Sequence, residues 1–519
     1  MGIFSNFVKS IKESLFGKAQ DISEKKQLKP SNKPQEKASA QLISDQKKID
    51  KILVEQTRSD TPIKETKVEV TPVKKTGRDP YFLQIGLDFG TSYTKCICRD
   101  IMTNKAWVHH YSRSIDKERP FLIPSLVIVK ENKIFHAEDT KSHYPLNGLF
   151  HLKNALVLAA NGDIDNPQLF TYRNAIKLKN KDQLPSFIAT CAVYYLAGVI
   201  GEIKSQIKLR FKGFGELPED YIAINMAIPV DNAQDRRISR LFNIVLCEAW
   251  GLSGELSGLS YMDITKLVSL IKNYRSENKN SSNNGCFIYP EVSANVQGFI
   301  RSRVSSPGVY LFSDAGGGTV DQSVFIFTRE DGIEHLHYLA GQVLPLGSSQ
   351  IENRIAQKCG DSGCKFLELW RERKERGENH NEINEAKNWI AGQLRIGTKK
   401  TLALSKKKLF NKDQLNGIRV IFGGGGHCDF PYKKAVMEPF TSNIFREELH
   451  PDEIGMPVPK DLDLKEHEYK WMNRLNVAYG LSFEQGDLAP YTFPPDDPKP
   501  EEIWHPTRQR STAPTKDEC

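Results

Sequence analysis

A run of three glycines between two apolar segments constrains this chain more than any other feature. The segment Phe312-Ser-Asp-Ala-Gly-Gly-Gly-Thr-Val-Asp321 follows the apolar residues 309–312 and precedes the apolar residues 324–327. This pattern predicts a strand, a glycine turn and a second strand. Glycine lets peptide N–H groups approach a polyphosphate closely, and a carboxylate at a strand end can hold a metal-bound water. The segment therefore predicts a hairpin with a phosphate-binding tip, and a plain tight turn is the alternative.

Two other segments repeat this idea. Residues 83–98 again indicate strand, turn and strand, with Asp88 at the turn entrance followed by Gly90, Thr91 and Ser92. Residues 418–427 indicate a strand that ends in four glycines and a histidine. Each segment alone has a structural alternative as an ordinary turn, because short motifs match by chance. Together they predict two phosphate clamps and a nucleoside floor.

In this order the three segments resemble the first phosphate, second phosphate and adenosine motifs of the actin/Hsp70/sugar-kinase ATPase superfamily. Other segments bring the resemblance closest to the Hsp70 ATPase domain: 150–156, 224–237, 289–294, 346–354 and 477–481. The resemblance covers about residues 80–485. It implies an α/β chain with a two-lobed actin-like ATPase fold of duplicated ribonuclease H-like domains, with lobe I at 80–300 and lobe II at 301–485.

The resemblance also implies a role for individual residues, with ATP and Mg²⁺ as ligands. The expected metal-water ligands are Asp88 and Asp314. The expected catalytic residues are Lys153, Glu291, Thr319 and Asp321. The expected nucleotide-binding residues are Gly90, Thr91, Ser92, Gly316, Gly317, Gly318, Gly423, Gly424, Gly425 and Lys387, although a solvated helix lysine is an equal alternative for Lys387. Water is the expected phosphoryl acceptor.

The sequence departs from the Hsp70 pattern near the base site, at Asn384 where the family has an acid, and near the C-terminus. His427 stands where the family has an arginine near the adenine, so the base preference is open. The segment after Gly480 is short and rich in proline, so we expect a tail at 486–519 and no peptide-binding domain. The charged run at 370–377 is interpreted as a solvated helix face or a partner contact.

The first 79 residues differ in character from the rest. Residues 1–18 hold apolar positions 3, 4, 7, 8, 11 and 15 on one helical face, which predicts an amphipathic helix that binds a membrane surface, a protein partner or its own ATPase body. Residues 19–79 are typical of a disordered linker. Residues 17–79 carry 15 Lys or Arg and 10 Asp or Glu. The basic charge therefore belongs to a tail, and no nucleic-acid binding is predicted.

The nine cysteines are scattered and include no Cys-x-x-Cys pair, which favours a reducing, cytoplasmic location, with peripheral attachment at the inner face of a membrane as an option. No stretch is expected to span a membrane.

Two functions follow from these features. The first is an Hsp70-like ATP-hydrolysing switch, slow and Mg²⁺-dependent, which acts through partners recruited by its tails and is related to chaperones. The alternative is a membrane-associated actin-like protein that polymerises on ATP, as an oligomer or filament.

Overall fold

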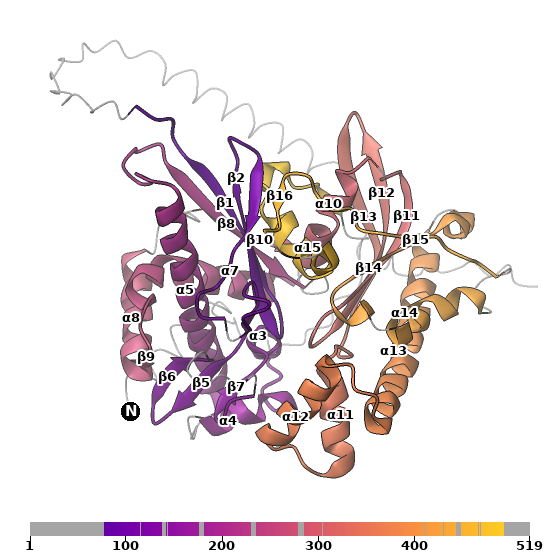
Figure 1. The fold of residues 1–519 in the computed structure, drawn as a ribbon, viewed down its shortest axis with the longest axis horizontal. Helices are drawn as coiled ribbons and strands as arrows, with labels where there is room; N and C mark the ends of the chain where they lie inside the picture. The colour runs from indigo at the N-terminus through magenta and orange to yellow at the C-terminus, as the bar shows by residue number, and fades with distance from the viewer. Residues whose placement is uncertain are drawn as a thin grey trace, which may run out of the picture. The chain divides into compact units, whose positions relative to one another are not determined.

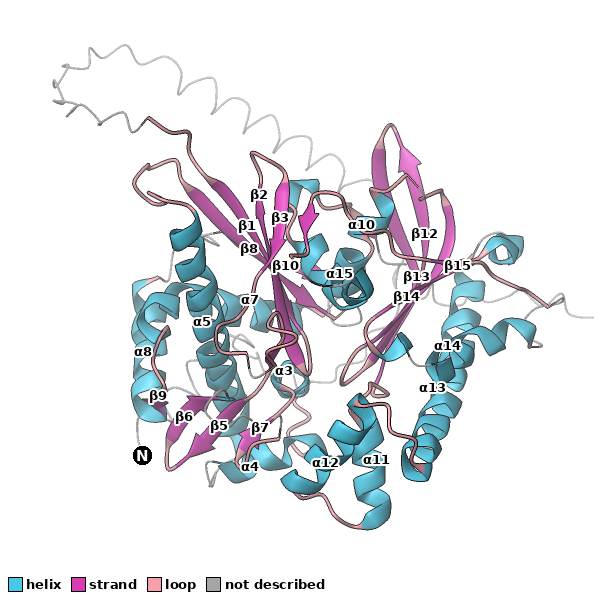
Figure 2. Ribbon diagram, viewed as in Figure 1, coloured by secondary structure: helices cyan, strands magenta, loops and turns pink. Residues whose placement is uncertain are grey.

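The structure is a computed structural model that describes residues 77–114, 116–137, 142, 144–175, 181–229, 235–278, 285–303, 305–409, 412–428, 430–442, 448–465, 467 and 469–492. The predicted amphipathic helix, nearly all of the predicted linker and most of the proline-rich tail lie outside the described residues. The described part is a mixed α/β protein in which helices pack on three β-sheets (Figures 1 and 2).

The first sheet has seven strands in the order β10-β8-β1-β2-β3-β16, with β4 paired to β2. Its central hairpin is the predicted unit around Asp88, in which β1 and β2 are antiparallel and Asp88 is opposite Lys95. Strand β8 runs parallel to β1 on the other side. The strands are β1 (Phe82–Phe89), β2 (Tyr93–Asp100), β3 (Lys105–Val108), β4 (Ile123–Pro124), β8 (Tyr221–Ile228), β10 (Cys286–Pro290) and β16 (Leu462–Asp463).

The second sheet has six strands in the order β15-β14-β11-β12-β13-β17. Its central hairpin is the predicted unit around Asp314, in which Asp314 is opposite Asp321. Strand β14 runs parallel to β11, so this sheet repeats the arrangement of β8, β1, β2 and β3 in the first sheet. The strands are β11 (Gly308–Ala315), β12 (Val320–Glu330), β13 (Ile333–Leu344), β14 (Arg419–Gly423), β15 (Glu453–Ile454) and β17 (Tyr491–Thr492).

Helices cover both sheets. Those beside the first sheet are α3 (Leu152–Asn161), α4 (Phe170–Ala175), α5 (Leu184–Arg210), α7 (Arg236–Leu256) and α8 (Ile264–Glu277). Those beside the second sheet are α11 (Gln350–Cys359), α12 (Cys364–Glu375), α13 (Asn381–Lys408) and α14 (Phe430–Met437). A small third sheet, in the order β7-β5-β6-β9, consists of β5 (Val127–Lys130), β6 (Lys133–His136), β7 (Gly148–Leu149) and β9 (Tyr261–Asp263).

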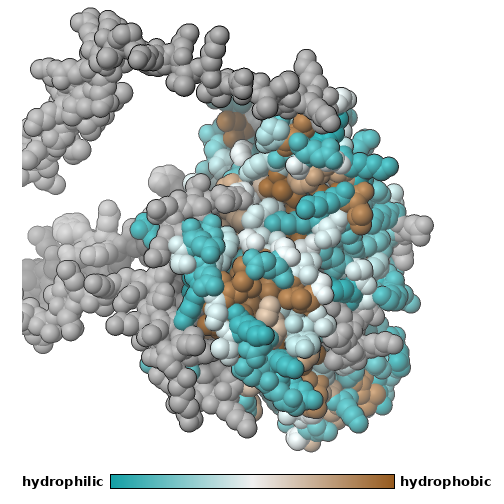
Figure 3. Space-filling model, turned by 90° about the vertical axis from the view of Figure 1, so that its left-hand side faces the viewer, coloured by the Kyte–Doolittle hydropathy of each residue, from teal (hydrophilic) through white to brown (hydrophobic). Residues whose placement is uncertain are grey.

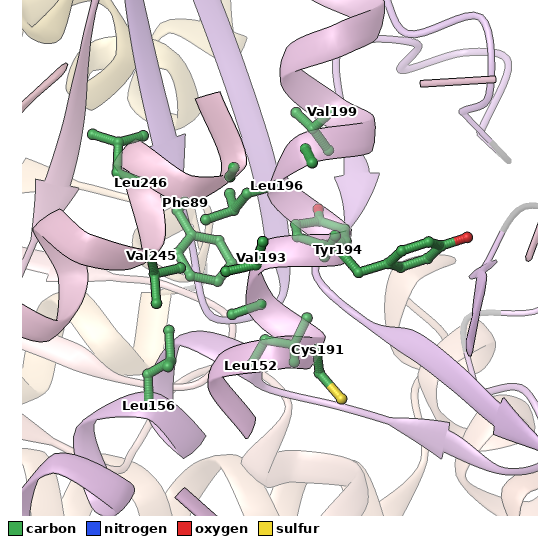
Figure 4. Packing of buried hydrophobic residues seen from close by; sticks show 14 of the residues in the cluster. Phe89, Leu152, Leu156, Cys191, Val193, Tyr194, Leu196, Val199, Val245 and Leu246 are labelled. Carbon is green, nitrogen blue, oxygen red and sulfur yellow. The ribbon is translucent and has the colours of Figure 1, made fainter. Parts of the chain in front are cut away.

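Helix α5 is the centre of the first hydrophobic core. Its side chains and those of α7 surround Phe89, at the end of β1 (Figure 4). The prediction that no stretch could span a membrane did not anticipate α5, which is long and apolar enough to do so. However, 94% of its most apolar window is buried inside the protein. An apolar helix that packs on all sides is a core helix. On the face that Figure 3 shows, the hydrophobic residues form separate patches among hydrophilic ones.

Helix α15 (Met472–Leu481) lies between the two sheets (Figure 1), where it packs against β1, β2 and β14 and crosses α9 (Glu291–Asn295). Helix α10 (Gln297–Ile300) follows α9 directly. At the crossing, a Cβ on Gly480 would lie 1.8 Å from the backbone oxygen of Ala294. The two helices can approach this closely only because residue 480 has no side chain.

Replacing Gly480 with alanine is expected to destabilise the protein by about 1–3 kcal/mol, because the added methyl group overlaps backbone that cannot move aside as a side chain can. Chemical denaturation of the full chain measures the loss. Gly392→Ala in α13 is the matched control, since nothing lies within 4 Å of its added Cβ and alanine favours the helix by up to about 1 kcal/mol. Equal stability of Gly480→Ala and wild type would contradict the close crossing.

Candidate functional site

A cavity of about 330 Å³ lies where the tips of the two central hairpins meet, and both sheets supply its walls. Twelve of the residues predicted from the sequence line it: Asp88, Gly90, Thr91, Ser92, Glu291, Asp314, Gly316, Gly317, Thr319, Asp321, Gly424 and Gly425. Segments more than 300 residues apart in the sequence therefore line the same cavity.

The two hairpin tips touch each other directly. A Cβ on Gly317 would lie 2.1 Å from Ser92 Oγ, and a Cβ on Gly318 would lie 2.4 Å from Thr91 Cγ2. Neither contact leaves room for a side chain on the second hairpin. The glycine run is thus required for the approach of the two tips, in addition to any turn that it makes.

The backbone of the second tip has a defined orientation. The carbonyl oxygens of residues 316, 317 and 318 accept hydrogen bonds from the N–H groups of Ser348, Ser349 and Gly347 at 3.0, 2.8 and 3.2 Å. Because a trans peptide points its N–H opposite to its carbonyl, the N–H groups of residues 317–319 point away from the 347–349 segment. They have no acceptor among the described residues. They are donors available to an anion.

Four carboxylates and two lysines gather at one end of the cavity. Asp88 pairs with Lys95 across the first hairpin, and buried Lys153 on α3 pairs with Glu291 at the start of α9. Asp314 Oδ2 accepts a hydrogen bond from Asn295 Nδ2 at 2.5 Å, and Asp321 Oδ2 accepts one from Thr319 Oγ1 at 2.8 Å. When all six groups are ionised the cluster has a net charge of −2.

Burial, together with the neighbouring charges, perturbs the ionisation of the cluster. Burial raises the pKa of Asp314 to about 7, and the neighbouring charge of Glu291 adds to the shift. Burial and Glu291 also raise the pKa of Asp321 well above its usual range. Burial opposes the charge of Lys153, but Glu291 and Asp88 outweigh it and the pKa of Lys153 is raised. A bound cation would favour the ionised form of both aspartates.

The cluster suits a hydrated divalent cation better than a directly coordinated one. Among the described residues, no three His, Cys, Asp or Glu side chains are placed to hold a metal ion between them. Asp88 Oδ1 is buried and has no hydrogen-bond partner, which leaves one acceptor open for a water. Magnesium commonly keeps several waters and uses only one or two protein carboxylates. The residues present therefore fit Mg²⁺ held through water.

The glycine-ended strand β14 closes another side of the cavity. Gly424 has φ +73°, and a Cβ there would lie 2.2 Å from Asp314 Oδ1, so only glycine fits. Gly423, at the end of β14, does not line the cavity. His427 is buried, its Nε2 lies 3.0 Å from Ser313 Oγ, and burial lowers the pKa of its ring to about 3. It is a neutral core residue.

Several charged residues that line the cavity were not predicted from the sequence. The charged run at 370–377 is not only a solvated face, because Arg371, Lys374 and Glu375 line the cavity. Three further predicted residues, Lys153, Gly318 and Lys387, do not line the cavity. Lys153 pairs with Glu291, which does. The spacing of residues in the sequence does not show which charged residues of α12 line the cavity and which face solvent. The missed lining residues also include Lys95, Tyr93 and Arg474.

Arg474 lines the cavity from α15, whereas Arg371 and Lys374 line it from α12. Its guanidinium lies beside Gly425, where an added Cβ would be 2.7 Å from Nε. Its Cζ is 5.3 Å from the centre of the Trp471 ring. Arg371, in contrast, donates to Tyr93 OH at 2.7 Å, and Lys374 pairs with Glu352 at 2.7 Å. Arg474 thus places guanidinium donors beside the glycine turn.

Comparison of the sequence with models of protein families finds no match. Comparison with curated proteins finds no match either.

Proposed function

We propose that this chain is an Hsp70-like, Mg²⁺-dependent ATP-hydrolysing switch with the two-lobed actin-like ATPase fold. In this proposal, lobe I holds the first sheet except β16, and lobe II holds the second sheet except β17, which lies in the predicted tail. The observation that carries the proposal is the contact of the two glycine-containing tips, Thr91-Ser92 and Gly317-Gly318, beside a cluster of four carboxylates and two lysines. The repeated strand arrangement of the two sheets supports a duplicated fold.

The chain's own groups match the needs of phosphoryl transfer to water. The N–H groups of residues 317–319 are free to bind phosphate oxygens. Lys153 would compensate negative charge that develops on the terminal phosphate, and Asp321 and Glu291 would orient the attacking water. Asp88 and Asp314 would hold Mg²⁺ through water, and the ion would neutralise the phosphate charge. Phosphoryl transfer depends mainly on such positioning and charge compensation.

The output of hydrolysis would be a change in the relative position of the lobes. Helices α9 and α15 cross between the sheets at Ala294 and Gly480, and they are the elements on which such a motion would turn. The predicted partner or membrane contact through residues 1–18 would transmit that change. This part of the proposal lies outside the described residues.

The direct test is single-turnover hydrolysis of γ-labelled ATP by the purified full chain, with and without Mg²⁺. We expect phosphate release that requires Mg²⁺ and is slow, as suits a switch. An absence of ATP-dependent phosphate release would contradict the ATPase proposal. Light scattering on the same samples tests the mode of action, because filaments that form with ATP and Mg²⁺ would contradict a monomeric switch.

Arg474→Ala is expected to weaken the binding of Mg·ATP about tenfold, since a charge-assisted hydrogen bond contributes about 1.5 kcal/mol or more. Adenosine affinity should fall in parallel, because Arg474 lies at the predicted adenosine turn, beside Gly425. Competition binding measures both ligands. Arg376→Ala, at the end of α12, is the matched control, because Arg376 is 65% exposed and does not line the cavity. Unchanged affinities for Arg474→Ala would remove this residue from the site.

A further inference from the structure

A second cavity, of about 360 Å³, forms where α5, α7 and β8 meet, and none of its lining residues lines the first cavity. Its size is that of a pocket for a small molecule. The residues on which the argument rests are Lys204 and Lys208 of α5, Trp250 of α7, Tyr221 and Ile222 of β8, and Phe214 from the segment before β8.

Lys204 is a half-buried cation that has only neutral partners among the described residues. Its Nζ donates to the backbone oxygen of Trp250 and to Ser253 Oγ, each at 3.0 Å, and lies 3.4 Å from the centre of the Trp250 ring. Burial lowers the pKa of Lys204 to about 8. Neighbouring Cys286 opposes this shift, and the charge of Lys208 adds to it. A buried cation without a counter-ion is unfavourable, so an anion in this cavity would stabilise it.

Lys208 lies one helical turn further along α5 and is exposed. It forms no ion pair with a described residue, and like charges four residues apart on a helix repel each other. The one carboxylate in the cavity wall, Asp220, is already engaged. It accepts from the backbone N–H groups of Tyr81, Gly215 and Leu217 at 2.9, 2.7 and 3.3 Å. The two lysines therefore leave positive charge available to a ligand.

The rest of the cavity wall is apolar or aromatic. Phe214 packs near the Tyr81 ring, with the ring centres 6.4 Å apart, and Tyr81 packs edge-on against Phe211. The Tyr221 side chain is 44% exposed at the mouth of the cavity. Such a wall favours an organic body over a bare inorganic ion, because an inorganic ion would gain nothing from the apolar surface.

We propose that this cavity is a binding site for a small organic anion, with a carboxylate or phosphate monoester between Lys204 and Lys208 and a compact apolar body against Phe214, Tyr221 and Ile222. The site is separate from the proposed ATP site, and this proposal does not depend on ATP binding.

The test uses the full chain labelled with 5-fluorotryptophan, with the Trp250 signal assigned through Trp250→Phe. Benzoate and phenyl phosphate are the anionic probes, and benzamide is the neutral probe of similar shape. We expect a saturable shift of the Trp250 ¹⁹F signal with an anionic probe and at least tenfold weaker binding of benzamide. Tighter binding of benzoate assigns a carboxylate ligand, and tighter binding of phenyl phosphate assigns a phosphate ligand. Equal binding of benzamide, or no saturable shift, would overturn the proposal.

Charge-removing variants separate the two lysines from general effects. Lys208→Met, at an exposed position that should not affect folding, is expected to weaken the anionic probe at least fivefold, while the control Lys266→Met, exposed on α8, leaves it unchanged. If the variant Lys204→Met does not fold, covalent labelling of Lys204 in the wild-type chain tests its role instead. Pyridoxal phosphate with borohydride should label Lys204, through attack of its amine on the aldehyde, loss of water and reduction of the C=N bond. Benzoate should protect Lys204 and not Lys266. Equal labelling of the two lysines, or no effect of Lys208→Met, would contradict the site.

Discussion

Lys153→Met is expected to lower the single-turnover rate of ATP hydrolysis by about 100-fold or more, while Mg·ATP still binds. The reason is the position of the Lys153 ammonium group. Lys153 is buried, pairs with Glu291 and lies within electrostatic reach of Asp88 and Asp321, so its charge is fixed where the terminal phosphate would react. Loss of one fixed charge or donor that acts on the transition state costs about 3–4 kcal/mol in characterised enzymes.

The control for Lys153→Met must account for the carboxylate left behind. Removing one partner of a buried ion pair destabilises a protein by about 3–5 kcal/mol, so loss of activity alone would not identify a catalytic role. The double variant Lys153→Met/Glu291→Gln removes both charges and should recover part of the stability without recovering the rate. Lys358→Met, 63% exposed on α11, controls for loss of a surface lysine. Hydrolysis by folded Lys153→Met at the wild-type rate would contradict the assigned role.

Asp314→Asn is expected to weaken Mg²⁺-dependent ATP binding about 10–100-fold, the usual effect of losing a group that holds a metal through its outer shell. The hydrogen bond from Asn295 should persist, because an amide oxygen at this position can accept it as the carboxylate does. Titration calorimetry of Mg·ATP measures the affinity. Glu330→Gln, at the exposed end of β12, is the matched control. Unchanged affinity would remove Asp314 from the metal site.

The raised pKa of Asp314 gives this variant a pH signature. An aspartate titrates near pH 4 in the unfolded chain and at about pH 7 in the folded protein, so the folded state binds the extra proton between these values. The stability that this group contributes is therefore present below about pH 4 and is lost as the pH rises to about 7. Without nucleotide, the stability of Asp314→Asn relative to wild type should increase by at least about 1 kcal/mol as the pH rises from 5 to 8.

The same ionisation predicts proton release on binding. If Mg·ATP binds the ionised form of Asp314, binding at pH 6.5 should release protons, and the heat of binding should vary with the ionisation enthalpy of the buffer. Asp314→Asn should release fewer protons than wild type, and Asp321, whose pKa is also raised, should supply the remainder. Equal release by the variant would show that Asp314 is not the group that ionises.

The sequence is sufficient to predict the two hairpins. In each one an acid stands at the end of an apolar strand and is followed by glycine, and local propensity and hydrophobic pattern agree. The structure places these strands at Phe82–Phe89 with Tyr93–Asp100 and at Gly308–Ala315 with Val320–Glu330. Only small residues allow the two tips to touch, and this requirement is readable as a glycine run. The strand that ends at Gly423 is predicted for the same reason.

The charged residues that complete the cavity are not predictable in this way. Arg371, Lys374 and Arg474 occur on helices, where a lone basic residue is most often solvated. They face the cavity because of the way α12 and α15 pack on other elements, and this packing depends on contacts distant in sequence. The long apolar helix α5 is a further example. Its composition alone does not show that it is buried in the protein core, because its burial depends on the elements that pack around it.

The central claim is that the cavity between the two hairpin tips binds Mg·ATP, and titration calorimetry of the full chain at pH 7.5 tests it most directly. Gly317→Val fills the contact with Ser92, where an added Cβ would lie 2.1 Å from Oγ, and Gly455→Val is the control, with nothing within 4 Å. We predict saturable binding of one Mg·ATP per wild-type chain, unchanged in Gly455→Val and at least tenfold weaker in Gly317→Val. Absence of saturable binding by the wild-type chain, or equal affinity of the two variants, would contradict the account.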